Sequence, residues 1–141
     1  MTPEDRVKCK NLIIKHETYK EFPYIDTTGH LTIGFGHNLE ARGLSYPVSS
    51  LALDEDITFW MVNLDRMLPI YKTLDPTRQA VLIDMCHNLG LHGVLEFHQM
   101  IEALEAKDYE GAASAMLESR WASQVGQRAI EDAYIMKTGE L

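Results

Sequence analysis

Hydrophobic residues recur at helical spacing through most of the chain. Between residues 48 and 67, Leu53, Ile57 and Leu64 are separated by four and seven positions, which places them on one face of a helix. Pro69 follows closely, and proline cannot continue a helix because it has no backbone N–H to donate. The pattern therefore predicts one long helix over residues 48–67.

Start and stop signals predict further helices on both sides of this one. Thr2 precedes Pro3 and two acidic residues, which is a typical helix start, and Asp75 precedes Pro76 in the same way. Gly90 is a typical residue at a helix end. The predicted helices cover residues 3–16, 76–90, 93–106, 109–119 and 127–137.

Residues 17–46 lack the helical pattern. Two short β-prone runs, Tyr24-Ile25 and Leu31-Thr32-Ile33, flank the turn-forming residues Asp26-Thr27-Thr28-Gly29. This arrangement predicts a β-hairpin in an otherwise helical chain, so the expected fold class is α+β. With 141 residues, 45% of them hydrophobic, the chain can bury one core, and we expect a single domain over residues 1–141.

The net charge and the hydropathy of the chain exclude some classes of binding partner. Lys and Arg total 13 against 21 Asp and Glu, a net charge of -8. A nucleic-acid-binding face needs clustered cations to neutralise phosphates, so we expect no nucleic-acid partner. No apolar run reaches the roughly 18 residues of a membrane span, and the charged N-terminus does not resemble a signal peptide. We therefore expect no stable membrane insertion.

Two carboxylates in the non-helical segment are candidates for chemistry. Glu17 falls at the end of the first predicted helix, and Asp26 falls nine positions later at the end of the first predicted strand. A glycosidase needs two carboxyl groups in different environments, one protonated and one ionised. Since acidic residues are frequent here, such a pair also arises by chance, and a solvated surface group is the alternative.

The surrounding residues resemble a known family. Glu17, Asp26, Gly29 and Thr32, with TIGFGH at residues 32–37, are similar in order and spacing to the phage-type lysozymes, glycoside hydrolase family 24. The helical part is also similar to that family, in residues 78–93 and in Ser119-Arg120-Trp121, Gln124 and Arg128-Ala129. The resemblance implies a mostly helical lysozyme-like fold. A small hairpin lobe (about 17–46) is joined by the long helix (about 48–67) to a helical lobe (about 69–141, with helix 3–16).

The resemblance also implies roles for three residues. Glu17 is the expected general acid, Asp26 the expected base that holds a water, and Thr32 the residue whose hydroxyl helps to hold that water. The alternatives are a surface carboxylate, a turn-stabilising Asp and an ordinary β-branched strand residue. An inverting enzyme keeps its two carboxyl groups about 6.5 to 9.5 Å apart to seat the water, and we predict this separation and inversion.

Three further residues are expected to support the site. The resemblance places Arg128 close to Glu17, where its charge favours the ionised acid while burial opposes it. His37 resembles a family histidine that pairs with an acidic residue on the long helix, and Asp56 is the best candidate for its partner. This pair is predicted to be a structural bridge between lobes, the alternative being an exposed pair that contributes little.

The sequence also offers candidates for substrate binding and an incomplete metal-binding motif. His87 and Asn88 fall near the end of the central predicted helix, where the family binds an acetamido sugar, and Asn88 has the amide suited to it. His16-Glu17 begins like a zinc-binding HExxH helix, but Lys20 occupies the place of the second histidine. We expect neither a metal ion nor another cofactor.

The resemblance implies a muramidase that hydrolyses the β-1,4 bond between N-acetylmuramic acid and N-acetylglucosamine in peptidoglycan. We expect a monomeric phage or prophage endolysin, made in the host cytoplasm without a signal peptide and released to the wall by another factor. Two alternatives remain: a catalytically silent wall-binding or tail-associated module, and the same mechanism on a chitin-like or modified glycan. The negative charge offers no long-range attraction to an anionic wall.

Overall fold

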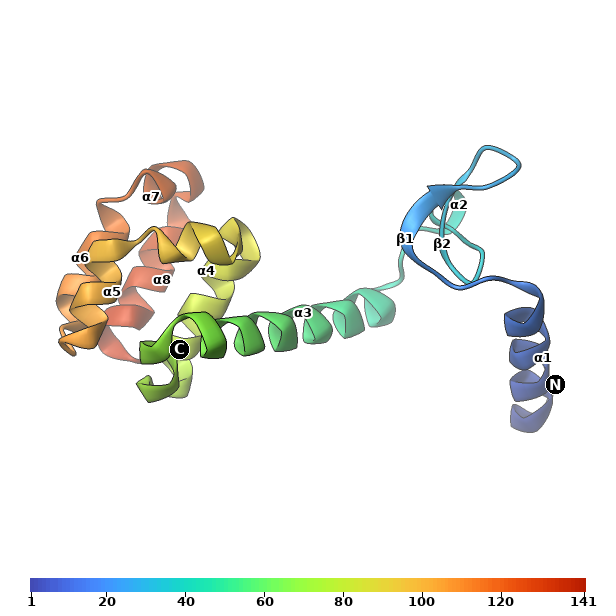
Figure 1. The fold of residues 1–141 in the computed structure, drawn as a ribbon, viewed down its shortest axis with the longest axis horizontal. Coiled ribbons are helices and arrows are strands. Elements are labelled where there is room, and N and C mark those ends of the chain that lie inside the picture. The colour runs from blue at the N-terminus through green and yellow to red at the C-terminus, as the bar shows by residue number, and fades with distance from the viewer. The chain divides into compact units, whose positions relative to one another are not determined.

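The computed structural model describes residues 1–141 and divides into two compact units, residues 1–51 and 52–141. Each unit is described by itself. Figure 1 labels most of the helices and strands of both, and the division falls inside the long helix α3 (Tyr46–Met67). The prediction of an α+β fold, mostly helical with a small sheet near the N-terminus, is confirmed.

The first unit contains a three-stranded antiparallel sheet. Its elements are α1 (Pro3–His16), β1 (Lys20–Ile25), β2 (Leu31–Gly34), β3 (His37–Asn38) and α2 (Leu39–Arg42). The strand order is β1-β2-β3, and Tyr24 pairs with Thr32 while Ile25 pairs with Leu31. The predicted hairpin is confirmed. Strand β3 and helix α2 were not predicted, because two and four residues are too few to establish a hydrophobic period.

Helix α1 begins and ends as the sequence predicts. The Thr2 hydroxyl accepts a hydrogen bond from the Asp5 N–H at 3.1 Å, and the Asp5 carboxylate accepts one from the Thr2 N–H at 3.3 Å. This reciprocal pair satisfies backbone donors that a helix start leaves free. At the other end Glu17 already has an extended backbone, with φ -100° and ψ 138°.

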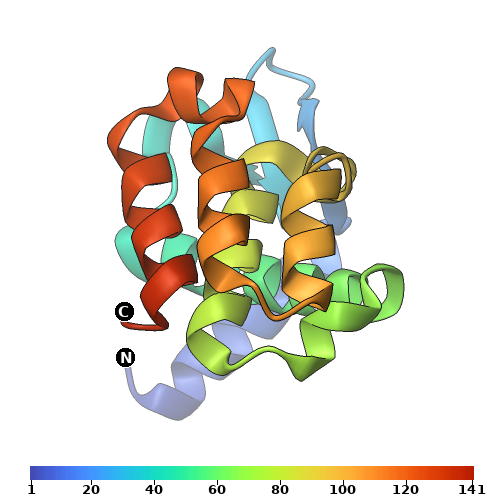
Figure 2. The ribbon, with the colours of Figure 1, turned by 90° about the vertical axis from the view of Figure 1, so that its left-hand side faces the viewer.

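The second unit is helical and contains the hydrophobic core. After α3 come η1 (Pro69–Thr73), α4 (Pro76–Leu95), α5 (His98–Glu105), α6 (Tyr109–Leu117), α7 (Arg120–Val125) and α8 (Gln127–Thr138). Helix α6 packs between α5 and α8, and Figure 2 shows these three helices side by side. The largest fully buried side chains are Leu64, Leu82, Met85, Met100, Leu104, Met116 and Met136. Burial of each contributes roughly 1.5 to 3 kcal/mol.

The predicted boundary at Gly90 was wrong in part. Gly90 leaves the helical conformation, with φ 76° and ψ 164°, but helical structure resumes and α4 continues to Leu95. The apolar residues after the kink pack into the core, where Val94 is fully buried, and this packing holds the chain helical. The next helix, α5, therefore begins at His98 and not at residue 93. The short helix α7 was not predicted, although Ser119 caps its first turn.

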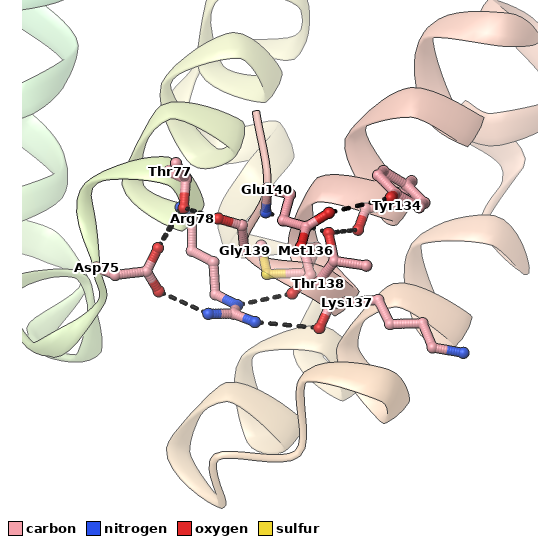
Figure 3. A network of polar contacts seen from close by, with 9 residues as sticks. All are labelled: Asp75, Thr77, Arg78, Tyr134, Met136, Lys137, Thr138, Gly139 and Glu140. Carbon is pink, nitrogen blue, oxygen red and sulfur yellow. Dashed lines mark hydrogen bonds and ion pairs between the residues drawn. The ribbon is translucent and has the colours of Figure 1, made fainter.

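The C-terminal end of α8 is fastened to the start of α4 by Arg78, as Figure 3 shows. The guanidinium donates to the carbonyl oxygens of Met136 and Lys137, at 2.7 and 3.0 Å, and to the Asp75 carboxylate at 2.7 Å. It also lies 3.7 Å from the centroid of the Tyr109 ring. One side chain therefore joins α4, α6 and α8. None of the helices is long and apolar enough to cross a membrane.

Candidate active site

The carboxylate of Glu17 lies against the backbone of Gly36. Glu17 is held at the end of α1 by a hydrogen bond from its N–H to the carbonyl oxygen of Ile13, at 2.8 Å. A Cβ atom placed on Gly36 would lie 3.0 Å from both Cδ and Oε2 of Glu17. Gly36 also has a φ of +72°, which a side chain disfavours. Both the space and the backbone conformation therefore call for glycine at this position.

One oxygen of Asp26 is saturated with hydrogen bonds from the β1–β2 turn. Oδ1 accepts from the Thr28 N–H at 2.9 Å, from the Thr28 hydroxyl at 2.9 Å and from the His30 N–H at 2.8 Å. The hydrogen bond from the His30 backbone, followed by that from the Thr28 hydroxyl, holds the pKa of Asp26 below its ordinary value. Oδ2 takes part in none of these hydrogen bonds. Asp26 is therefore ionised and keeps one oxygen free.

Thr32 is buried in β2, with 3% of its surface exposed. Its hydroxyl donates to the carbonyl oxygen of His30 at 2.9 Å, and the same carbonyl accepts the Asp26 N–H at 2.9 Å. The backbone of His30 thus links Thr32 to Asp26. Because the single hydroxyl hydrogen of Thr32 is engaged, its oxygen is available to a further molecule only as an acceptor.

Glu17 and Asp26 therefore have different surroundings within the first unit. Three donors converge on Asp26, whereas no donor from residues 1–51 forms a hydrogen bond with the Glu17 carboxylate. Hydrogen bonds to a carboxylate favour its ionised form. The unequal placement of donors is the asymmetry that an acid and a base require of two chemically similar groups.

Two of the residues expected to support the site, Arg128 and His37, have other partners in their own units. Arg128 on α8 binds Asp84 on α4 through Nε and Nη2, both at 2.8 Å. The His37 Nε2 lies 2.5 Å from the carbonyl oxygen of Gly43. Asp56 lies on α3, in the second unit. The predicted proximity of Arg128 to Glu17, and of His37 to Asp56, joins residues of different units and stays a prediction.

Asn88 and His87 both lie on the exposed side of α4, just before its kink. The Asn88 Oδ1 accepts a hydrogen bond from Nε1 of Trp121 at 2.7 Å. Trp121 is buried, with 4% of its surface exposed, and its indole N–H needs such a partner. The carbonyl of Asn88 therefore has a structural use, and its NH₂ group is the part left for a substrate.

Sequence reasoning missed several residues that touch the candidate site. Gly36 was not expected to contact Glu17, Thr28 was treated as a turn residue only, and His30 was given no role. Their signal is present in the DTTGH sequence of the turn, where short polar side chains follow Asp26 at positions that can fold back onto it. No group of three or more His, Cys, Asp or Glu residues is placed to hold a metal ion.

Comparison with known proteins identifies the family. The family model described as Phage lysozyme matches residues 14–132, which include all three proposed catalytic residues. The chain belongs to the phage lysozyme family. The resemblance inferred from residues 17–37 and from the helical part is thereby confirmed.

Relatives of the chain at low sequence identity include proteins of different kinds. Probable T4-type lysozymes 1 and 2 of Dictyostelium discoideum are 26% and 23% identical, each over 94% of this chain and 95% of their own length. The pre-baseplate central spike protein Gp5 of Enterobacteria phage T4 is 27% identical over 84% of this chain. That alignment spans only 25% of the spike protein. The chain is therefore similar to nearly the whole of two proteins named as lysozymes and to about a quarter of a larger spike protein.

Proposed function

We propose that this chain is a muramidase that hydrolyses the β-1,4 bond between N-acetylmuramic acid and N-acetylglucosamine in peptidoglycan. Membership of the phage lysozyme family supports a glycoside hydrolase. The observation that carries the proposal is the arrangement at Asp26, where Oδ1 accepts three hydrogen bonds and Oδ2 is left free. An ionised carboxylate with one fixed and one free oxygen is suited to act as a general base.

Glu17 is the proposed general acid. Its carboxyl proton passes to the glycosidic oxygen as the bond from that oxygen to the anomeric carbon breaks, so the departing sugar leaves as an alcohol. Gly36 supports this role because its missing side chain leaves the space in which the carboxyl group lies. The conjugate base that remains on Glu17 is reprotonated from solvent.

Asp26 and Thr32 are proposed to hold the attacking water between them. One water hydrogen is donated to Oδ2 of Asp26 and the other to Oγ1 of Thr32, whose own hydrogen is engaged by His30. A lone pair of the water is then left for the anomeric carbon. As the new C–O bond forms, Asp26 takes the proton, and the product has the inverted α configuration. This mechanism predicts the carboxyl separation of about 6.5 to 9.5 Å.

The remaining candidates are proposed to assist. Arg128 is proposed to face Glu17 and to modulate its protonation, His37 and Asp56 to bridge the hairpin lobe and the long helix, and Asn88 with His87 to contact an acetamido group. Asn88 would use its NH₂ group, since its carbonyl accepts the indole N–H of Trp121. Substitution of any of these five is expected to reduce activity less than substitution of Glu17 or Asp26.

The test is release of reducing ends from purified peptidoglycan by the wild type, Glu17→Gln and Asp26→Asn. Glu21→Gln is the matched control, since Glu21 is an exposed acid on β1 with no side-chain hydrogen bond. Both catalytic variants are expected to lose about 10²- to 10⁴-fold in kcat, the usual contribution of a general acid or base. Equal rates for all four proteins would contradict the assignment.

Proton NMR of the first products tests the stereochemistry separately. An initial excess of the α-anomer is expected for attack by water on the face opposite the departing sugar. An initial excess of the β-anomer would require Asp26 to act as a nucleophile. Chitin as a second substrate distinguishes the muramidase from an enzyme of chitin-like glycans, because the proposal expects reducing ends from peptidoglycan only.

The match to the phage T4 central spike protein favours a second candidate, a wall-binding or tail-associated module without catalysis. That candidate requires the wild type to sediment with insoluble peptidoglycan and to release no reducing ends. The donors arranged around Asp26 favour the enzyme, because binding alone does not require an ionised carboxylate with a free oxygen.

The proposed biological role is that of an endolysin that reaches the wall from the host cytoplasm with the help of another factor. Expression in bacteria tests this role: lysis is expected only when a pore-forming protein is produced at the same time. Lysis without that protein would contradict it. A monomer is proposed, and light scattering during gel filtration measures its mass against the 16.0 kDa of the chain.

A further inference from the structure

A chain of three side chains runs from Asp26 along the outside of the β1–β2 turn. The Thr28 hydroxyl lies 2.9 Å from Oδ1 of Asp26 and 2.8 Å from Nδ1 of His30. The His30 Nδ1 itself is 3.8 Å from the same carboxylate oxygen. All three residues lie within one turn of the first unit, so this geometry is independent of the second unit.

The direction of the hydrogen bonds in this chain follows from counting protons. A hydroxyl has one hydrogen to donate, and an ionised carboxylate can only accept. Thr28 therefore donates to Asp26, and its oxygen must accept from His30. The hydrogen of neutral His30 is thus placed on Nδ1. The opposite orientation, with Thr28 donating to His30, would set two acceptor oxygens 2.9 Å apart.

We propose that His30 is a positioning residue for the base: its Nδ1–H directs the Thr28 hydroxyl onto Oδ1 of Asp26 and so leaves Oδ2 to receive the proton of the water. This inference rests on the proposed function of Asp26 and deepens it. Protonation of Nε2 leaves the Nδ1–H in place, so His30 still donates to Thr28 and Thr28 still donates to Asp26. The protonation adds a positive charge 3.8 Å from the base.

A turn that is only structural does not require the hydrogen bonds that link the side chains of Asp26, Thr28 and His30. The backbone N–H groups of Thr28 and His30 close the turn onto Asp26 by themselves, at 2.9 and 2.8 Å, and remain with any side chain at positions 28 and 30. Both side chains are exposed, and exposed polar contacts contribute little to stability. If the turn is only structural, removing the hydroxyl or the imidazole should leave kcat unchanged.

The tautomer of His30 is tested without substrate. In the full chain with ¹⁵N-labelled histidine, at a pH where the ring is neutral, the nitrogen shifts of His30 are expected to identify the Nδ1–H form. Thr28→Val removes the hydroxyl and should return His30 to a mixture dominated by Nε2–H. Thr27→Val, which removes a neighbouring hydroxyl that makes no such contact, should change nothing. Nε2–H as the main form in the wild type would overturn the proposal.

The pH profile of kcat/KM tests the effect on the base. Thr28→Val removes the hydroxyl that donates to Asp26, and His30→Ala removes the donor that directs this hydroxyl and the nearby imidazole charge. Both are expected to move the acidic limb to higher pH, because the ionised form of Asp26 is less favoured, and to lower kcat several-fold. His30→Asn places a neutral amide donor at the position of Nδ1, and it should restore most of kcat. Unchanged acidic limbs in Thr28→Val and His30→Ala would overturn the proposal.

The two proposals fail in distinguishable ways. An inactive wild type overturns the proposed function, and the positioning role with it. An active wild type whose His30 carries its hydrogen on Nε2 overturns the positioning role alone.

Discussion

The carboxylate of Glu17 occupies the space that a side chain at position 36 would need. A Cβ atom on Gly36 would lie 3.0 Å from Oε2 and 3.2 Å from Oε1. Real Cβ atoms make contacts this short only when a neighbour shifts. The turn between β2 and β3 therefore sets where the proposed acid can lie, although the two residues are far apart in the sequence.

Gly36→Ala is expected to lower kcat about tenfold or more with little change in KM, because the new methyl group displaces the Glu17 carboxyl group. Steady-state kinetics on soluble glycan fragments measures kcat and KM separately. Gly34→Ala is the control, since Gly34 has a similar φ of +66° but no atom within 4 Å of an added Cβ. Equal kcat values for the two variants would show that backbone strain, and not contact with Glu17, is the cause.

Asn88→Ala is expected to destabilise the second unit by about 1 to 3 kcal/mol, because the buried indole N–H of Trp121 loses its acceptor. Asn88→Asp keeps an acceptor oxygen and should recover most of that stability. Urea unfolding followed by tryptophan fluorescence measures both. If Asn88→Asp also raises KM while its stability is normal, the NH₂ group contacts substrate as proposed.

Asp132 should make stability depend on pH in the opposite direction to most carboxylates. Burial, and next the charge of Asp84, raise its pKa from 3.8 to about 7, and its Oδ2 is buried without a hydrogen-bond donor. Between pH 4 and 7 the unfolded chain releases this proton while the folded protein keeps it. The stability that this carboxyl contributes is therefore present below pH 4 and is lost as the pH rises to 7.

Asp132→Asn removes that titration and keeps a neutral polar side chain of the same size. Relative to the wild type, its free energy of unfolding should rise by up to about 1.4 kcal/mol per pH unit between pH 4 and 7 and level off above. Urea unfolding at several pH values measures the difference. The exposed Glu105→Gln serves as the control and should show no such trend. A pH-independent difference for Asp132→Asn would contradict the raised pKa.

Arg78→Met is expected to lower the free energy of unfolding by about 3 kcal/mol. The Arg78 side chain is only 12% exposed, and its guanidinium makes charge-assisted hydrogen bonds to Asp75, Met136 and Lys137, which the methionine cannot replace. Lys72→Met is the comparison, because Lys72 pairs with Asp65 while both side chains are more than half exposed. That variant should lose less than about 1 kcal/mol.

Much of the helical structure follows from local signals. Asp75 was predicted to lie at a helix start, and in the structure its carboxylate accepts from the N–H group of Arg78. The carboxylate of Asp108 accepts from the N–H group of Gly111 in the same way. These contacts span three residues, so adjacent positions in the sequence are sufficient to predict them. Gly90 shows where local signals fail, because burial of Val94 in the core decides that α4 continues beyond it.

Some features of the proposed site could likewise be predicted from the sequence, and others could not. The order and spacing of Glu17, Asp26 and Thr32 resembled the family, and the match of the family model confirmed that resemblance. The contact of Gly36 with Glu17 could not be predicted, because it depends on how the β2–β3 turn folds back onto α1. Neither could the pairing of Asp84 with Arg128, which are 44 positions apart.

By itself the sequence determined the fold class, the family and which carboxylates to consider, because capping, turn chemistry and hydrophobic period act over a few neighbouring residues. Only the folded structure decided the contact of Gly36 with Glu17 and, within a turn that the sequence signals, which oxygen of Asp26 is fixed and where the proton of neutral His30 must lie. Hydrogen-bond direction depends on distances of about 3 Å between particular atoms. Such distances exist only once the hairpin has folded.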